Sequence, residues 1–79
     1  MRIDKYLKVS RLIKRRTVAH DACEEGRVTV NDKVAKAGTD VKPGDIICIH
    51  FGNAEVKVRV VSTPEHVTKD DSASLYETL

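Results

Sequence analysis

Basic side chains are concentrated at the amino-terminal end of the chain, and phosphate binding is the chemistry that suits them. Residues 1–20 carry one acid, Asp4, and seven cations: Arg2, Lys5, Lys8, Arg11, Lys14, Arg15 and Arg16. Cations this close together repel one another, and phosphates relieve that repulsion while counterions are released. Arginine can also fork two hydrogen bonds onto one phosphate or stack on an exposed base. An ordinary solvated surface is the alternative interpretation of such a cluster.

The total charge hides this concentration. The 79 residues have a net charge of +2, which comes from +6 over residues 1–20, −1 over residues 21–63 and −3 over residues 64–79. A basic head, a nearly neutral middle and an acidic end favour a polyanionic partner for the head. Only three aromatic side chains, Tyr6, Phe51 and Tyr76, could stack on bases. We therefore expect recognition of folded RNA through its shape and backbone, rather than stacking on single strands.

Catalytic and metal-binding chemistry has weak support in the sequence. The four glycines fall at predicted turns, so no phosphate-binding glycine loop is present. His20 and Cys23 have a helical spacing that could supply two zinc ligands, whereas Cys48, His50 and His66 lack a paired spacing. We expect no catalytic residue, no metal and no cofactor, and we interpret both cysteines as small buried side chains. The acids Asp21, Glu24 and Glu25 are interpreted as a solvated helix face.

Two short helices are expected to position the cations. Ile3, Tyr6 and Leu7 have the spacing of an amphipathic helix, and the lysines of this segment point to its other side. A second helix is predicted to begin with Thr17 or a neighbour as its cap and to stop at Gly26. Four of its side chains fall in one apolar sector: Val18, Ala19, Ala22 and Cys23.

From Arg27 the apolar period changes to two, which predicts an antiparallel sheet. The expected strands contain Val28 and Val30, the run 46–51, and the alternating valines of 56–60. Asn31-Asp32, Pro43-Gly44 and Gly52-Asn53 supply the turns. Beyond residue 62 the alternation ceases, so we divide the chain into a domain of residues 1–62 and an acidic tail of residues 63–79, either disordered or docked. No window is apolar for the roughly 18 residues of a membrane span, and we expect a cytoplasmic protein with no membrane partner.

Four blocks of this sequence, in order, resemble the S4-type RNA-binding domain. They are Arg2-Ile3-Asp4-Lys5-Tyr6-Leu7, Lys14-Arg15-Arg16-Thr17-x-Ala19, Gly26-Arg27-Val28-x-Val30-Asn31 and Val41-Lys42-Pro43-Gly44-Asp45-Ile46. The resemblance covers roughly residues 1–51 and implies an α+β fold, in which two short amino-terminal helices pack on a small bent antiparallel sheet. It also implies that the helical face and the following loop bind structured RNA.

The resemblance assigns roles to individual positions. Asp4 matches the acid that orients the first helix and nearby basic groups, and Arg16 matches the arginine that begins the second helix. Arg15 departs from the pattern, because the family commonly has a serine that caps the second helix there. Either Thr17 takes over the capping, or the helix starts differently and an additional cation faces the RNA.

The run of residues 1–16 and the tail 72–77 are similar to the small S4-domain factors of bacterial ribosome-associated quality control, and to the related heat-shock RNA-binding proteins of the 50S subunit. The resemblance implies a monomeric, non-catalytic factor that binds 23S rRNA at helix 69 and P-site tRNA on obstructed 50S subunits. There it would assist the tailing factor that adds alanine to stalled nascent chains. Two alternatives remain open: heat-shock-type 50S recycling, and a protein-interaction module whose acidic tail recruits a partner.

Overall fold

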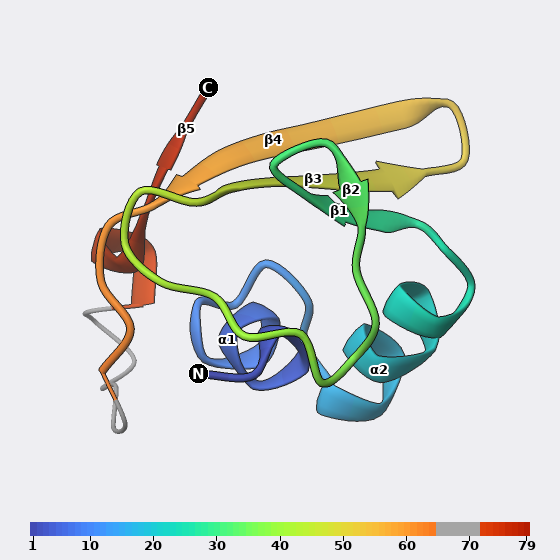
Figure 1. The fold of residues 1–79 in the computed structure, drawn as a ribbon, viewed down its shortest axis with the longest axis horizontal. Coiled ribbons are helices and arrows are strands. Elements are labelled where there is room, and N and C mark those ends of the chain that lie inside the picture. Colours follow the sequence, from blue (N-terminus) through green and yellow to red (C-terminus); the bar gives the residue numbers. More distant parts are fainter. Residues whose placement is uncertain (65–71) are drawn as a thin grey trace.

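The structure is a computed structural model and describes residues 1–64 and 72–79. These residues contain two helices and a five-stranded antiparallel sheet (Figure 1). The helices are α1 (Ile3–Val9) and α2 (Arg16–Glu24). The strands are β1 (Val28–Val30), β2 (Lys33–Val34), β3 (Ile46–Phe51), β4 (Ala54–Val60) and β5 (Tyr76–Thr78), and a short 3₁₀ helix, η1 (Ser72–Leu75), precedes β5. The predicted α+β fold is confirmed.

The strands lie in the order β2-β1-β3-β4-β5, and each is antiparallel to its neighbours. Asn31 and Asp32, which join β1 to β2, have φ angles of 52° and 68°. Asparagine and aspartate tolerate this left-handed conformation better than most residues, as the sequence predicted for this turn. Asn31 also fastens the neighbouring loop, because its amide accepts from the Ile46 N–H at 3.0 Å and donates to Asp45 at 3.2 Å. The turn between β1 and β2 therefore also holds the start of β3 in place.

Both helices lie on one face of the sheet, and the core fills the space between them (Figure 1). On α1, Ile3, Tyr6 and Leu7 are fully buried, which confirms the amphipathic pattern. From β3, Ile47 and Ile49 are fully buried in the same core. Because side chains alternate along a strand, the residues between and beyond these isoleucines point to the opposite face of the sheet.

The first turn of α1 is held by the loop that leads to β3 rather than by a capping side chain. The N–H of Ile3 donates to the carbonyl of Thr39 at 2.8 Å, and the N–H of Asp4 donates to that of Ala37 at 3.4 Å. The loop is tied in turn to α2, because the N–H of Ala37 donates to the Glu24 carboxylate at 3.0 Å. Glu24 is exposed, as the sequence predicted, and its carboxylate also holds this loop against α2.

The second helix differs from the prediction at two positions. It begins at Arg16, with Arg15 at the N-cap and no capping bond from a side chain, so Thr17 does not take over the capping. Val18 is 50% exposed, although the pattern placed it in the core. Only Ala19 and Cys23 of α2 are buried, and because these residues are four apart they form one narrow stripe from which Val18 is turned away by about 100° or more. Gly26, with φ of 78°, follows the helix as expected.

The described end of the tail docks on the domain. Leu75 is 2% exposed, its carbonyl accepts a 2.6 Å hydrogen bond from the buried Tyr6 hydroxyl, and β5 pairs with β4. The tail acids Glu65, Asp70 and Asp71 lie outside the described residues, so the division at residue 62 stays a prediction. In the part of the chain that is described, no helix is long and apolar enough to cross a membrane.

Candidate nucleic-acid interface

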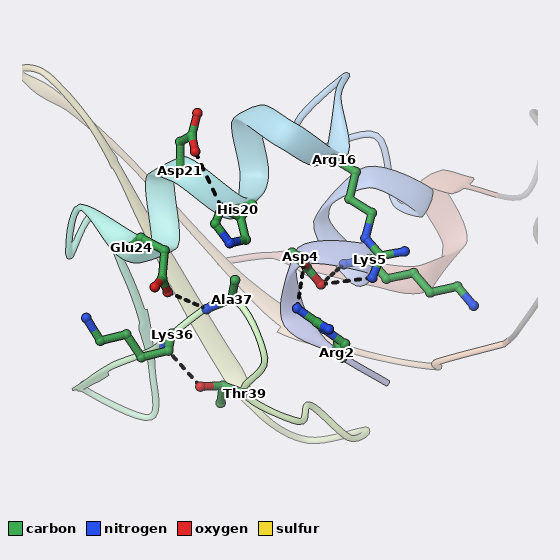
Figure 2. Close-up of polar contacts among 10 residues, drawn as sticks. All are labelled: Arg2, Asp4, Lys5, Arg16, His20, Asp21, Glu24, Lys36, Ala37 and Thr39. Atoms are coloured by element: carbon green, nitrogen blue, oxygen red, sulfur yellow. Dashed lines mark hydrogen bonds and ion pairs between the residues drawn. The ribbon is translucent and has the colours of Figure 1, made fainter.

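A buried carboxylate connects the two helices at the centre of the basic head. Asp4 lies on α1 with its side chain 4% exposed, and it forms ion pairs with the guanidinium groups of Arg2 at 3.2 Å and Arg16 at 3.5 Å (Figure 2). Both arginines remain about half exposed, at 55% and 48%. One Asp4 oxygen also accepts from the N–H of Lys5 at 2.8 Å. The acid thus orients two arginines while leaving each able to donate outward.

The start of α2 concentrates positive charge. Lys14, Arg15 and Arg16 enter the helix, and all three are exposed. The positive end of the helix dipole lies at this point, and the first turn contains no acid. Cations at this end are repelled by the positive end of the helix dipole. In addition, the first N–H groups of a helix have no hydrogen-bond partner within the helix. An incoming anion relieves both conditions, so this end of α2 suits a phosphate.

Arg11 lies between the two helices in a strained conformation. Its φ is 63°, and its N–H donates to the carbonyl of Lys8 at 3.0 Å, so it fills the left-handed position that usually ends a helix with glycine. An arginine in this conformation costs more than glycine, and its side chain is exposed. The sequence places a long cation where backbone geometry favours glycine.

The remaining cations surround this centre without joining it. Lys8, Arg11, Lys14 and Arg15 have exposed side chains, and none of them forms an ion pair with an acid of residues 1–64 or 72–79. Lys5 contacts Asp4 through its backbone N–H, and its partly buried side chain extends away from the acid (Figure 2). The structure therefore brings together the side chains of Arg2, Asp4 and Arg16, and places Lys8, Arg11, Lys14 and Arg15 elsewhere on α1 and the α1–α2 loop.

A hollow beside Arg16 includes residues that sequence reasoning missed. It has a volume of about 320 Å³ and is lined by Asp4, Arg16, Thr17, His20 and Asp21. Nδ1 of His20 lies 3.4 Å from the Asp21 carboxylate. The four-residue spacing from Arg16 to His20 on α2 is the signal that could have placed this histidine beside the cations.

The zinc pair that the sequence offered is not formed. Cys23 is fully buried in the core, where burial raises the pKa of its thiol to about 11, with Asp4 and Glu24 contributing. His20 instead has its side chain half exposed on the surface of α2. The sequence interpretation was also wrong that Cys48 and His50 lack a paired spacing, because residues two apart on a strand share a face. Their Sγ and Nε2 atoms lie 3.6 Å apart.

Comparison with known proteins shows the family to which this chain belongs. A family model for the S4 domain matches residues 1–47. The RQC P-site tRNA stabilizing factor of Halalkalibacterium halodurans is 57% identical over 98% of this chain and 88% of its own length. The chain belongs to the S4-domain family of RQC P-site tRNA stabilizing factors.

Other members and a solved structure agree with this assignment. The RQC P-site tRNA stabilizing factor of Bacillus subtilis is 47% identical over 100% of this chain and 92% of its own. This chain superimposes on the trimeric structure of Vibrio cholerae heat shock protein 15 with a TM-score of 0.91 and 26% sequence identity. The match covers 100% of this chain and 81% of the heat shock protein chain. The S4 match contains every candidate RNA-binding residue, whereas β4 and β5 lie beyond it. The resemblance drawn from the sequence is confirmed.

Proposed function

We propose that this stabilizing-factor homologue binds 23S rRNA, at helix 69, and P-site tRNA on obstructed 50S subunits in the cytoplasm. There it supports the tailing factor that adds alanine to stalled nascent chains. It acts as a monomer and as a binding protein rather than an enzyme. Family membership supports P-site tRNA as a partner, and the basic head supports phosphate contacts as the means of binding.

The observation that carries the proposal is the Asp4-centred arrangement of Arg2 and Arg16. An arginine side chain loses conformational entropy when it binds a phosphate. Ion pairs to a buried acid restrict the side chain before binding, so the entropy lost on binding is smaller. Because the two arginines come from before α1 and from the start of α2, one carboxylate sets their relative position. A phosphate backbone can then meet two oriented guanidinium groups and the uncapped end of α2 together.

Charge reversal at Arg16 tests this proposal. We expect Arg16→Glu to abolish co-sedimentation with 50S subunits, because a carboxylate replaces a phosphate-binding cation and faces the buried Asp4. Arg59→Glu is the matched control, since Arg59 is about half exposed on β4, where it pairs with Glu77 at 3.0 Å. Circular dichroism and thermal melts would establish that both variants are folded. Retained 50S binding by folded Arg16→Glu would contradict the proposal.

The similarity to heat shock protein 15 favours a second candidate, heat-shock-type recycling of 50S subunits. The two candidates differ in which cellular process fails when the factor is absent. Under the first, cells lacking the factor lose alanine tails on stalled chains, and the purified particle contains tRNA and the tailing factor. Under the second, tailing continues while tRNA-obstructed 50S subunits accumulate after heat shock. Mass spectrometry of nascent-chain ends separates these outcomes.

In the third candidate function, the acidic tail recruits a protein partner. Deleting the tail would test it poorly, because Leu75 belongs to the core and β5 completes the sheet. Replacing Glu65, Asp70, Asp71 and Glu77 with the corresponding amides removes the charge and keeps the chain. Loss of tailing-factor recruitment with intact 50S binding would favour this candidate, whereas unchanged recruitment would exclude it.

A further inference from the structure

A compact set of metal-binding side chains lies on the β3–β4 hairpin, apart from the basic head. Cys48, His50 and Glu55 each offer one ligand atom, and these atoms all lie within 4.8 Å of one another. Cys48 and His50 are two residues apart on β3, and Glu55 on β4 is directly opposite His50 in the sheet register. Two antiparallel strands therefore fix the relative positions of three potential ligands.

These side chains occupy the face of the sheet opposite the helices. Ile47 and Ile49 point into the core, so the alternation of β3 turns Cys48 and His50 to the other side. Cys48 as a whole is 7% exposed, while His50 and Glu55 have about half of their side-chain surface exposed. A solvated ion can approach from the exposed pair and meet a partly shielded sulfur. The candidate RNA-binding cations lie on α1, on α2 and in the segments beside them, and none of them belongs to β3 or β4.

The chemistry of the donors favours zinc over magnesium and calcium. Thiolate, imidazole and carboxylate are its usual ligands, whereas magnesium and calcium avoid sulfur. In a tetrahedral site with bonds of about 2.0–2.3 Å, neighbouring ligand atoms lie roughly 3.3–3.8 Å apart. The 3.6 Å separation of Cys48 Sγ and His50 Nε2 fits this geometry. Three protein ligands leave one position for water or for a donor from a partner.

We propose that Cys48, His50 and Glu55 bind one zinc ion across the β3–β4 hairpin. Binding replaces the thiol proton, which leaves to solvent, so that a zinc–sulfur bond forms with no change of oxidation state. Zinc binding therefore releases a proton and strengthens as pH rises. By joining two strands of the folded state, the ion also stabilises the hairpin.

Cobalt titration of the chelator-treated, reduced full-length protein tests the proposal. Co²⁺ in the site should give a near-ultraviolet thiolate charge-transfer band and visible bands of tetrahedral intensity, and Zn²⁺ should displace both. Cys48→Ser should abolish the charge-transfer band, and His50→Asn and Glu55→Gln should each weaken Co²⁺ binding by more than about tenfold. Zn²⁺ should raise the melting temperature of the unmodified chain but not of Cys48→Ser.

Matched controls come from the pair on α2. Cys23→Ala and His20→Asn should keep the full cobalt spectrum, because the buried Cys23 lies outside the hairpin cluster. Glu55→Gln changes an exposed side chain and keeps its size, so it provides a folded variant if the others fail to fold. An unmodified chain without a charge-transfer band, or a Glu55→Gln variant that binds Co²⁺ equally well, would overturn the proposal. None of these outcomes depends on binding of the 50S subunit.

Discussion

At the scale of single residues, the basic head contains two arginines oriented by ion pairs and one arginine with a strained backbone. Asp4 orients Arg2 and Arg16 through ion pairs, whereas Arg11 holds its charge on a left-handed backbone. Residue types in the sequence identified all of these positions as candidates. The strain at Arg11 could not be predicted, because an arginine gives no local signal for positive φ.

Arg11 separates backbone cost from side-chain function. We expect Arg11→Gly to be more stable than Arg11→Ala by about 1 kcal/mol, because glycine relieves the left-handed strain and alanine retains it. Both variants lack the charge, so both should bind 50S subunits more weakly, to a similar degree. Urea denaturation and filter binding measure the two effects. Equal stability of the two variants would argue against strain at this position.

Tyr6 makes stability depend on alkaline pH. Burial, with a smaller contribution from Tyr76, raises its pKa from 10.0 to about 12. The neutral phenol donates the buried hydrogen bond to Leu75, so this stabilisation is complete below pH 10 and is lost as pH rises to 12. The loss should be on the order of 2–3 kcal/mol. Cys23 titrates in the same range, so the measurement is the difference in unfolding free energy between the original chain and Tyr6→Phe. This difference should shrink through that pH range.

At the scale of elements, the hydrophobic periodicity predicted both helices, three strands and the turns between them. It missed β2 and β5, because each contains only one apolar residue and so shows no alternation, whereas the equally short β1 has valines at both ends. It also misplaced Val18, since periodicity gives the direction of a side chain but not the width of the surface that covers it. The contact of Glu24 with Ala37 depends on a loop whose path no local pattern specifies.

Asn31 links two of these elements, and substitutions can separate its two contributions. Asn31→Ala removes the hydrogen bonds to Asp45 and Ile46 and leaves a β-carbon in the left-handed region, which should cost roughly 2–3 kcal/mol. Asn31→Gly removes the hydrogen bonds alone and should cost roughly 1–2 kcal/mol. Chemical denaturation gives both values. A glycine variant less stable than the alanine variant would contradict the assignment of a strained turn.

At the scale of the whole molecule, the separation of charge along the sequence becomes a separation in space. The helices and the loop between them carry the basic head on one side, and the opposite face of the sheet carries mixed charges such as Arg59 and Glu77. The sequence could predict the charge segregation, because charge is counted directly. It could not predict that α1 and α2 share one buried acid, which depends on how the helices pack.

This arrangement predicts a steep dependence of RNA binding on salt. If about five cations of the head contact phosphates, the logarithm of affinity should fall with the logarithm of salt concentration with a slope of about −4. Arg16→Gln should reduce the magnitude of the slope by about one, and Arg59→Gln should leave it unchanged. Titrations of a 23S rRNA fragment at several salt concentrations provide the measurement. A slope near zero would exclude phosphate binding as the source of affinity.

The hydrogen bond between Tyr6 and Leu75 has a consequence for the synthesis of this protein. It joins residues 69 positions apart, so the first helix meets its final partner only when Leu75 is available. Because synthesis proceeds from the amino terminus, the basic head is complete before the core around Tyr6 can acquire this hydrogen bond.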